Sequence, residues 1–181
     1  MMKVAIMQPY IFPYIGYFQL INAVDAFVFY DDVNFIKKGF IHRNHLLFDG
    51  KITRFTIPCK EISQNKKVNE IKLDQESAAI KKLSISIKQY YNQAPYFEDI
   101  MPLLDSFFNS TRPHQTISEF AIESVQLVCN YLDLDSIFKI SSLEHSESLD
   151  YGRADRLIAI TKKEGGIDYI NSIGGQDLKS C

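Results

Sequence analysis

Two short apolar runs near the N-terminus constrain the fold of this chain more than any other feature. Residues 4–7 (Val-Ala-Ile-Met) and residues 26–30 (Ala-Phe-Val-Phe-Tyr) are apolar or aromatic throughout, which is typical of strands buried on both faces. Between them, apolar residues recur at helical spacing from Tyr17 to Val24. We therefore predict a β-α-β unit with two parallel strands and a right-handed crossover.

The remainder of the chain mixes strand and helix patterns. Residues 45–48 and 52–57 lie on either side of Asp49-Gly50, a turn dipeptide that favours an antiparallel hairpin. Asp74 is expected to cap the helix that follows it, and Thr116 with Glu119 forms a capping-box pattern before another helix. The other predicted elements are a strand at 68–73, a helix after Pro95, a strand at 137–140, a glycine-closed helix at 153–164 and a strand at 167–171.

These elements predict an α/β fold: a mostly parallel sheet with helices on both faces, nucleotidyl-transferase-like or Rossmann-like, with a small antiparallel hairpin and a helical insertion. A length of 181 residues fits one domain spanning residues 1–181. The formal charge of −2 provides no general basic field for nucleic acid. No apolar run reaches membrane-spanning length, no signal segment is evident, and three cysteines lack metal-type spacing, so we expect a cytoplasmic protein.

Polar residues are concentrated where the first two strands end. In α/β proteins the loops that follow the strands form the ligand crevice. Gln8 follows the first strand, and Asp31 and Asp32 follow the second. Because adjacent residues on a strand point to opposite faces, we expect one acid to orient a hydroxyl, hold a metal or act as a base. The alternative is an acid that caps a turn or helix.

Gly16 lies between Tyr14 and Tyr17, where the first strand passes into a helix. The N–H groups at a helix start suit a phosphate or carboxylate. The placement is similar to the His-Ile-Gly-His motif of nucleotidyl transferases, with tyrosine in place of both histidines. The alternative is that Gly16 permits close helix packing and that Tyr17 belongs to the core.

A basic cluster around Gly39-Phe40 is the third candidate feature. Arginine binds phosphate bidentately and lysine supplies a point charge, so a sugar nucleotide or acyl phosphate would suit it. His42 is a candidate acid or base, although a lone histidine is more often structural, and a charge run is more often a solvated loop. The candidate residues here are Lys37, Lys38, His42, Arg43 and Asn44.

Near the C-terminus, Asn171 ends the last predicted strand, and Gly174 and Gly175 permit either close backbone approach to a ligand or a tight turn. Serine-hydrolase elbows, zinc pairs and paired-cysteine motifs are absent from the sequence. We therefore predict no covalent nucleophile and assign no metal ligands, and the sequence identifies no cofactor.

Several motifs resemble the WbqC-like family. They are residues 7–10 (Met-Gln-Pro-Tyr), 12–18, 30–33 (Tyr-Asp-Asp-Val), 37–44, 92–97 and 169–176, and the similarity extends over essentially the whole chain. The family occurs in bacterial gene clusters for O-antigen and other surface polysaccharides. The resemblance implies a glycine or aminoacyl transferase that acts on a sugar or sugar nucleotide in lipopolysaccharide biosynthesis.

Two other functions stay open. One is a nucleotidyl-transferase-like enzyme that activates a small acid or sugar phosphate, and the other is a non-catalytic binding protein of the polysaccharide machinery. Each would take a small, phosphate-bearing ligand. Relatives usually continue for several more elements, so we also expect this chain to lack C-terminal elements and to expose apolar surface beside its last strand.

Overall fold

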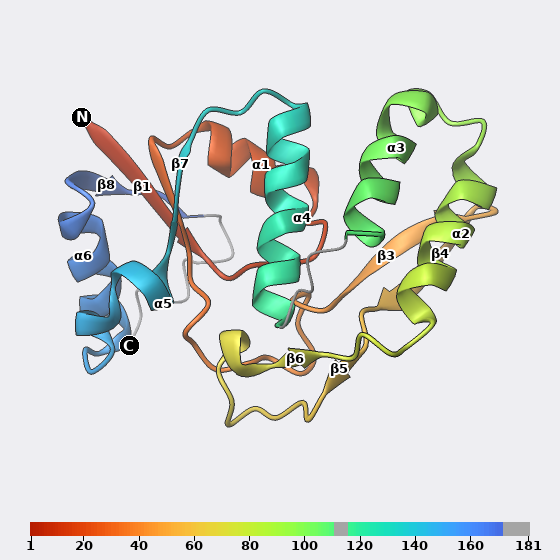
Figure 1. The fold of residues 1–181 in the computed structure, drawn as a ribbon. Coiled ribbons are helices and arrows are strands. Elements are labelled where there is room, and N and C mark those ends of the chain that lie inside the picture. Colours follow the sequence, from red (N-terminus) through yellow and green to blue (C-terminus); the bar gives the residue numbers. More distant parts are fainter. Residues whose placement is uncertain (111–115, 172–181) are drawn as a thin grey trace. The chain divides into compact units, whose positions relative to one another are not determined.

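The computed structural model describes residues 1–110 and 116–171, and it divides into two compact units (Figure 1). The first, which we call the sheet unit, comprises Met1–Pro9, Pro13–Val33 and the chain from Val128 onward. The second, which we call the hairpin unit, comprises Tyr10–Phe12 and Asn34–Leu127.

A parallel sheet forms the centre of the sheet unit. Within the described residues its strand order is β7-β2-β1-β8. The strands are β1 (Met2–Met7), β2 (Ala26–Phe29), β7 (Ile137–Ile140) and β8 (Gly166–Tyr169). Helix α1 (Ile15–Asn22) connects β1 to β2, which pair in parallel with Val4 opposite Ala26. The β-α-β unit and the later strands that the sequence predicts are thereby confirmed.

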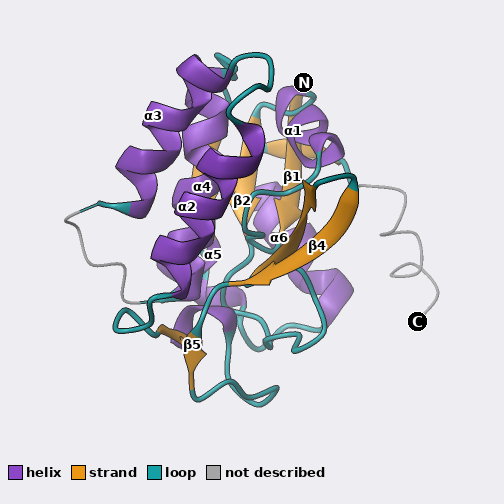
Figure 2. Cartoon of the chain, turned by 90° about the vertical axis from the view of Figure 1, so that its right-hand side faces the viewer, coloured by secondary structure: helices purple, strands orange, loops and turns teal. Residues whose placement is uncertain are grey.

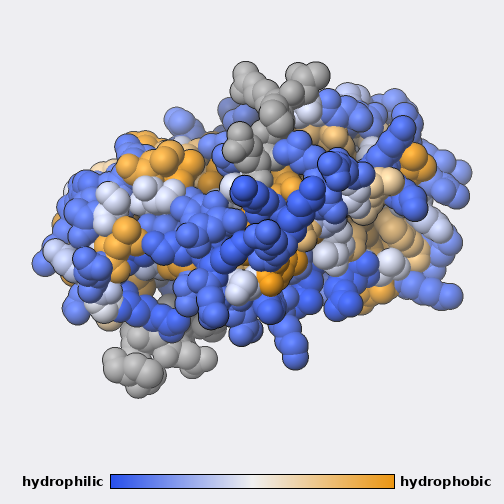
Figure 3. Space-filling view, turned by 60° about the horizontal axis from the view of Figure 1, so that its bottom comes forward, coloured by the Kyte–Doolittle hydropathy of each residue, from blue (hydrophilic) through white to orange (hydrophobic). Residues whose placement is uncertain are grey.

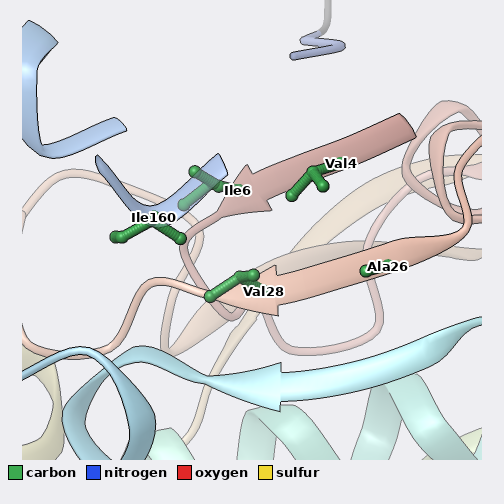
Figure 4. Packing of buried hydrophobic residues seen from close by; sticks show 5 residues of the cluster. All are labelled: Val4, Ile6, Ala26, Val28 and Ile160. Carbon is green, nitrogen blue, oxygen red and sulfur yellow. The ribbon is translucent and has the colours of Figure 1, made fainter. Parts of the chain in front are cut away.

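Each face of this sheet is covered by a different helix, because alternate residues of a strand point to opposite faces. The apolar cluster on one face consists of Val4, Ile6, Ala26, Val28 and Ile160, the last of which belongs to α6 (Arg153–Lys163) (Figure 4). On the other face, the ring of Tyr17 in α1 lies 5.2 Å from the ring of Phe27. The prediction of helices on both faces is therefore confirmed for this unit.

The predicted hairpin forms in the second unit. Strands β3 (Arg43–Phe48) and β4 (Lys51–Thr56) turn at Asp49 and Gly50, whose φ angles are 49° and 73°. Two consecutive positive φ angles match the twist of a tight hairpin, which is why the Asp-Gly pair favours it. Helix α2 (Ala79–Tyr91) lies beside the hairpin (Figure 2), with the ring of Phe48 stacked 4.5 Å from that of Tyr90.

Two predictions about residues 68–79 are wrong. The expected strand at 68–73 is a 3₁₀ turn, η1 (Val68–Glu70), followed by the short strand β6 (Lys72–Leu73), which pairs with β5 (Cys59–Lys60). Asp74 is not a helix cap, since α2 begins at Ala79. The N–H group of Asp74 donates to the carbonyl of Pro58 at 2.9 Å, which keeps this residue in the β5–β6 segment.

The remaining helices include one that the sequence did not predict. These elements are α3 (Phe97–Phe108), α4 (Ile117–Tyr131), the short α5 (Ser141–Glu144) and the 3₁₀ turn η2 (Ser146–Ser148). The capping box before α4 is confirmed, because Thr116 N–H donates to Glu119 Oε2 at 3.1 Å and Glu119 N–H donates to Thr116 Oγ1 at 3.3 Å. In the described part of the chain, none of the helices combines the length and apolar character that crossing a membrane requires.

The packing of the sheet unit predicts that two isoleucines of α6 differ in how much they contribute to stability. Ile160 is 1% exposed and Ile158 is 52% exposed. We expect Ile160→Ala to lower the free energy of unfolding by about 2–5 kcal/mol, because it leaves a cavity. Ile158→Ala should change it by no more than about 0.5 kcal/mol. Urea denaturation measures both, and equal losses would contradict the packing described.

Candidate functional site

The strand order places a topological switch point between β1 and β8. From β1 the sheet adds β2 and β7 on one side and β8 on the other. In open α/β sheets, ligands bind at the carboxyl ends of the strands beside such a point. Gln8 directly follows β1 and Asn171 lies two residues beyond β8, so both predicted amides belong to this end of the sheet. The predicted Gly174 and Gly175, and the surface expected beyond the last strand, lie outside the described residues.

Asp31 and Asp32 lie just beyond the end of β2 and are buried, at 3% and 4% exposure. Both carboxylates converge on one hydroxyl, since Ser141 Oγ lies 2.6 Å from Asp32 Oδ1 and 3.1 Å from Asp31 Oδ1. The expectation that the two acids would point to opposite faces is wrong. Strand β2 ends at Phe29, so the alternation of a strand does not extend to the bend that follows.

Asp31 is bonded to the start of α5. Its carboxylate accepts hydrogen bonds from the N–H group of Ser142 at 3.0 Å and from the hydroxyl of Ser142 at 2.8 Å. A carboxylate at a helix start pairs with N–H groups that have no partner within the helix. Asp31 therefore caps the start of α5, which is the alternative to a catalytic role that the sequence left open.

Asp32 is paired with Arg156, which comes from the first turn of α6. Arg156 Nη2 lies 2.5 Å from Asp32 Oδ2, and both side chains are buried. The guanidinium carbon lies 4.7 Å from the ring centroid of Tyr30, and Nε donates to Ser148 Oγ at 3.2 Å. Burial alone would lower the pKa of Arg156, but its hydrogen bond to Asp32 and its interactions with Tyr30 hold the pKa above its ordinary value.

Two tyrosines complete this group. Burial raises the pKa of Tyr30, and burial together with the nearby Tyr30 raises the pKa of Tyr169 to about 12. Both phenols therefore keep their protons at neutral pH and can donate hydrogen bonds. We call the following residues the strand-end cluster: Tyr30, Asp31, Asp32, Ser141, Ser142, Arg156 and Tyr169.

The strand-end cluster combines oriented carboxylates, a guanidinium and hydroxyl donors. Such groups can orient a hydroxyl-rich or anionic ligand by hydrogen bonds. Within residues 1–110 and 116–171, no group of three or more His, Cys, Asp or Glu side chains is arranged to hold a metal ion.

At the start of α1, Tyr14 and Ile15 are exposed and Tyr17 is buried. The exposed ring of Tyr14 lies over Gly16, where a Cβ atom would meet the ring and require it to shift. Tyr17 is buried, and its hydroxyl donates to the carbonyl of Gln8 at 2.9 Å. The burial of Tyr17 supports the alternative that it belongs to the core, whereas both alternatives for Gly16 stay open. Anion binding at this helix start stays a prediction.

The other predicted site residues belong to the hairpin unit. Arg43 Nε donates to the carbonyl of Gly39 at 2.8 Å, and the amide of Asn44 donates to the carbonyls of residues 11 and 12 at 3.1 and 2.7 Å. Lys37 and Lys38 are exposed. Because the start of α1 lies in the sheet unit, convergence of these cations with it on one pocket stays a prediction.

Two histidines, one in each unit, are buried. Burial lowers the pKa of His42, with a smaller contribution from Arg43, and burial also lowers the pKa of His145. His42 packs on Phe35, with ring centroids 5.1 Å apart. His145 Nε2 lies 3.1 Å from Glu164 Oε1, but the angles are not those of a hydrogen bond. Burial therefore favours the neutral form of both imidazoles.

Comparison with known proteins agrees with the motifs in the sequence. A sequence model of the WbqC-like protein family matches residues 8–180, nearly the whole chain. The chain is also 26% identical over 176 residues to the uncharacterized protein Rv1507c of Mycobacterium tuberculosis (strain ATCC 25618 / H37Rv). That match covers 94% of this chain and 72% of the relative. No solved structure matches the chain significantly.

The buried pair predicts a large and specific loss of stability. Arg156→Met should lower the free energy of unfolding by about 3–5 kcal/mol, because it leaves the Asp32 carboxylate buried without its partner. The exposed Arg153 of the same helix provides the control, and Arg153→Met should change stability by no more than about 0.5 kcal/mol. Adding Asp32→Leu to Arg156→Met should recover part of the loss. Urea denaturation measures the free energy of unfolding of each variant. If the double variant is no more stable than Arg156→Met alone, the Asp32–Arg156 ion pair is not the cause of the loss.

The buried histidines predict a pH dependence of stability. Their pKa values are lowered in the folded state from the ordinary 6.5, so below about pH 6.5 the unfolded chain binds more protons. The free energy of unfolding should therefore fall as the pH falls below 6.5, by up to about 1.4 kcal/mol per pH unit for each histidine. His145→Gln should reduce this slope, and His45→Gln, at an exposed position, should not. Identical slopes in the parent and His145→Gln would refute the prediction.

Proposed function

The chain belongs to the WbqC-like protein family, and we propose that it is a group transferase that binds a sugar or sugar nucleotide at the strand-end cluster. The proposed transferred group is glycine or another aminoacyl group. The proposed pathway is the biosynthesis of a bacterial surface polysaccharide such as O-antigen.

One observation carries this proposal: Asp31, Asp32 and Arg156 are all buried at the carboxyl end of a parallel sheet. Burying charged groups costs solvation free energy, and apolar residues of similar volume are often at least as stabilising. Asp31 also has a structural role at the start of α5, but stability alone gives little reason for the buried pair of Asp32 and Arg156 at this place. The position is also the one where open α/β sheets bind their ligands.

The proposed mechanism relies on positioning and proton transfer rather than on a covalent intermediate. In it, a hydroxyl or amine of the sugar attacks the carbonyl carbon of an activated acyl donor, and the donor's leaving group departs. Burial raises the pKa of Cys59 to about 12 and that of Cys129 to about 11, so neither thiol is a ready nucleophile. His42, whose pKa burial lowers, stays a candidate base, and Lys37, Lys38 and Arg43 stay candidates for binding phosphate.

A nucleotidyl-transferase-like activity is the second candidate. It is favoured by the parallel β1-α1-β2 unit, in which Gly16 lies in the first turn of the helix after the first strand, and by analogy with Rossmann-like folds. Release of pyrophosphate from a nucleoside triphosphate would distinguish this activity from acyl transfer.

A non-catalytic binding role is the third candidate. It is favoured by the internal partners of both acids, since Asp31 bonds to α5 and Asp32 pairs with Arg156. Binding of a nucleotide sugar without any turnover would support this role.

The acids predict the outcome of an activity test. Asp31→Asn and Asp32→Asn should each lower the rate of glycine transfer to nucleotide sugars by about 100-fold or more, the scale of a lost positioning or acid–base group. The control is Asp168→Asn, at an exposed position of β8, which should keep the parent rate. Circular dichroism establishes that each variant is folded.

Two results would contradict this mechanism. Full turnover by a folded double variant, Asp31→Asn with Asp32→Asn, would remove both acids from the reaction. Mass-spectrometric trapping of an acyl group on Cys59 would exclude the non-covalent route.

A further inference from the structure

Basic residues are concentrated in two neighbouring segments of the hairpin unit. The cations are Lys37, Lys38, Arg43, Lys51 and Arg54 within residues 37–54, and Lys81, Lys82 and Lys88 within α2. Asp49 is the one acid in these two segments, so eight cations against one anion give a formal charge of +7. The whole chain has a formal charge of −2, so its charge is strongly asymmetric.

The β3–β4 hairpin has one covered face and one open face. Residues paired across an antiparallel hairpin point to the same side. Phe48 lies on the side that stacks on Tyr90 of α2. The opposite side, which we call the outward face, carries the cross-strand pairs Arg43 and Thr56, His45 and Arg54, and Leu47 and Ile52.

Apolar side chains lie at the tip of the outward face. Leu47 and Ile52 are neighbours across the strands, one pair away from the turn, and are 54% and 79% exposed. Arg54 lies in the next pair of this face and forms no ion pair with any described residue. Scattered apolar groups are ordinary on a protein surface, as the face drawn in Figure 3 shows. A paired apolar tip with an exposed arginine in the next pair of the same face is a more specific arrangement.

We propose that the outward face docks on an anionic lipid bilayer. In this arrangement Leu47 and Ile52 enter the headgroup region and Arg54 faces the lipid phosphates, while Lys51 and the lysines of α2, which belong to the covered side, add to the positive field of this part of the chain. An anionic bilayer can bury apolar side chains in its headgroup region and attract neighbouring cations to its phosphates, and it needs no shaped pocket to do so. A free phosphate-bearing ligand would pair with the cations but would leave the apolar tip in water. This docking is independent of the proposed transferase activity.

A single tryptophan tests insertion of the tip. The chain contains no tryptophan, so Ile52→Trp places one fluorophore there. Its emission should shift to shorter wavelength with vesicles of phosphatidylcholine containing about one-third phosphatidylglycerol, and not with phosphatidylcholine alone. Ile158→Trp, at an exposed position of α6, should show no shift. No shift at position 52, or the same shift at position 158, would overturn the proposal.

Co-sedimentation with the same vesicles tests the role of charge. Arg54→Gln should weaken binding about fivefold and Arg54→Glu more, and binding should fall as salt is added. Lys162→Glu, at an exposed position of α6, should bind as the parent does. Equal binding by the parent and Arg54→Glu would overturn the proposal. Binding to polyglutamate or to an oligonucleotide, with none to the anionic vesicles, would also overturn it and indicate a macromolecular partner.

Discussion

The buried pair of Asp32 and Arg156 connects the elements that form the carboxyl end of the sheet unit. Asp32 follows β2, Arg156 comes from the first turn of α6, and Ser141, which bonds to Asp32, begins α5. Three elements that are distant in sequence are therefore held by one small set of polar contacts. Because desolvation offsets much of the attraction in a buried pair, its clearer effect is to define positions.

Local patterns explain which parts of the fold and site could be predicted. Continuous apolar runs indicate parallel strands, and the acids after β2 were predicted from their place at a strand end. Arg156 was not predicted, because it lies 124 residues from its partner and no local pattern connects them. Asp74 illustrates the opposite case, in which a local pattern was misleading. It is a residue type that often caps helices, but its N–H group donates to the carbonyl of Pro58 in a neighbouring segment instead. Gly16 was ambiguous, because close packing and ligand binding favour the same residue.

The N-terminal block has a structural role as well. Residues 10–12 leave the sheet unit and belong to the hairpin unit, between Pro9 and Pro13. Phe12 has a φ of 43°, which is unfavourable for a residue with a side chain. Its N–H group donates to Ser124 Oγ at 3.1 Å, and its carbonyl accepts from the amide of Asn44 at 2.7 Å. Part of the density of aromatic and amide residues in this block therefore stabilises a strained connection.

Ligand binding at the strand-end cluster is tested most directly by a nuclear magnetic resonance titration with nucleotide sugars. The Nε–H signal of Arg156 reports on the cluster, and that of Arg54 in the hairpin provides an internal control. Binding at the cluster predicts a saturable shift of the Arg156 signal, together with the backbone signals of Asp31 and Ser142, while the Arg54 signal stays fixed. If the signals of the strand-end cluster stay unchanged with every nucleotide sugar that is titrated, ligand binding at the cluster is contradicted.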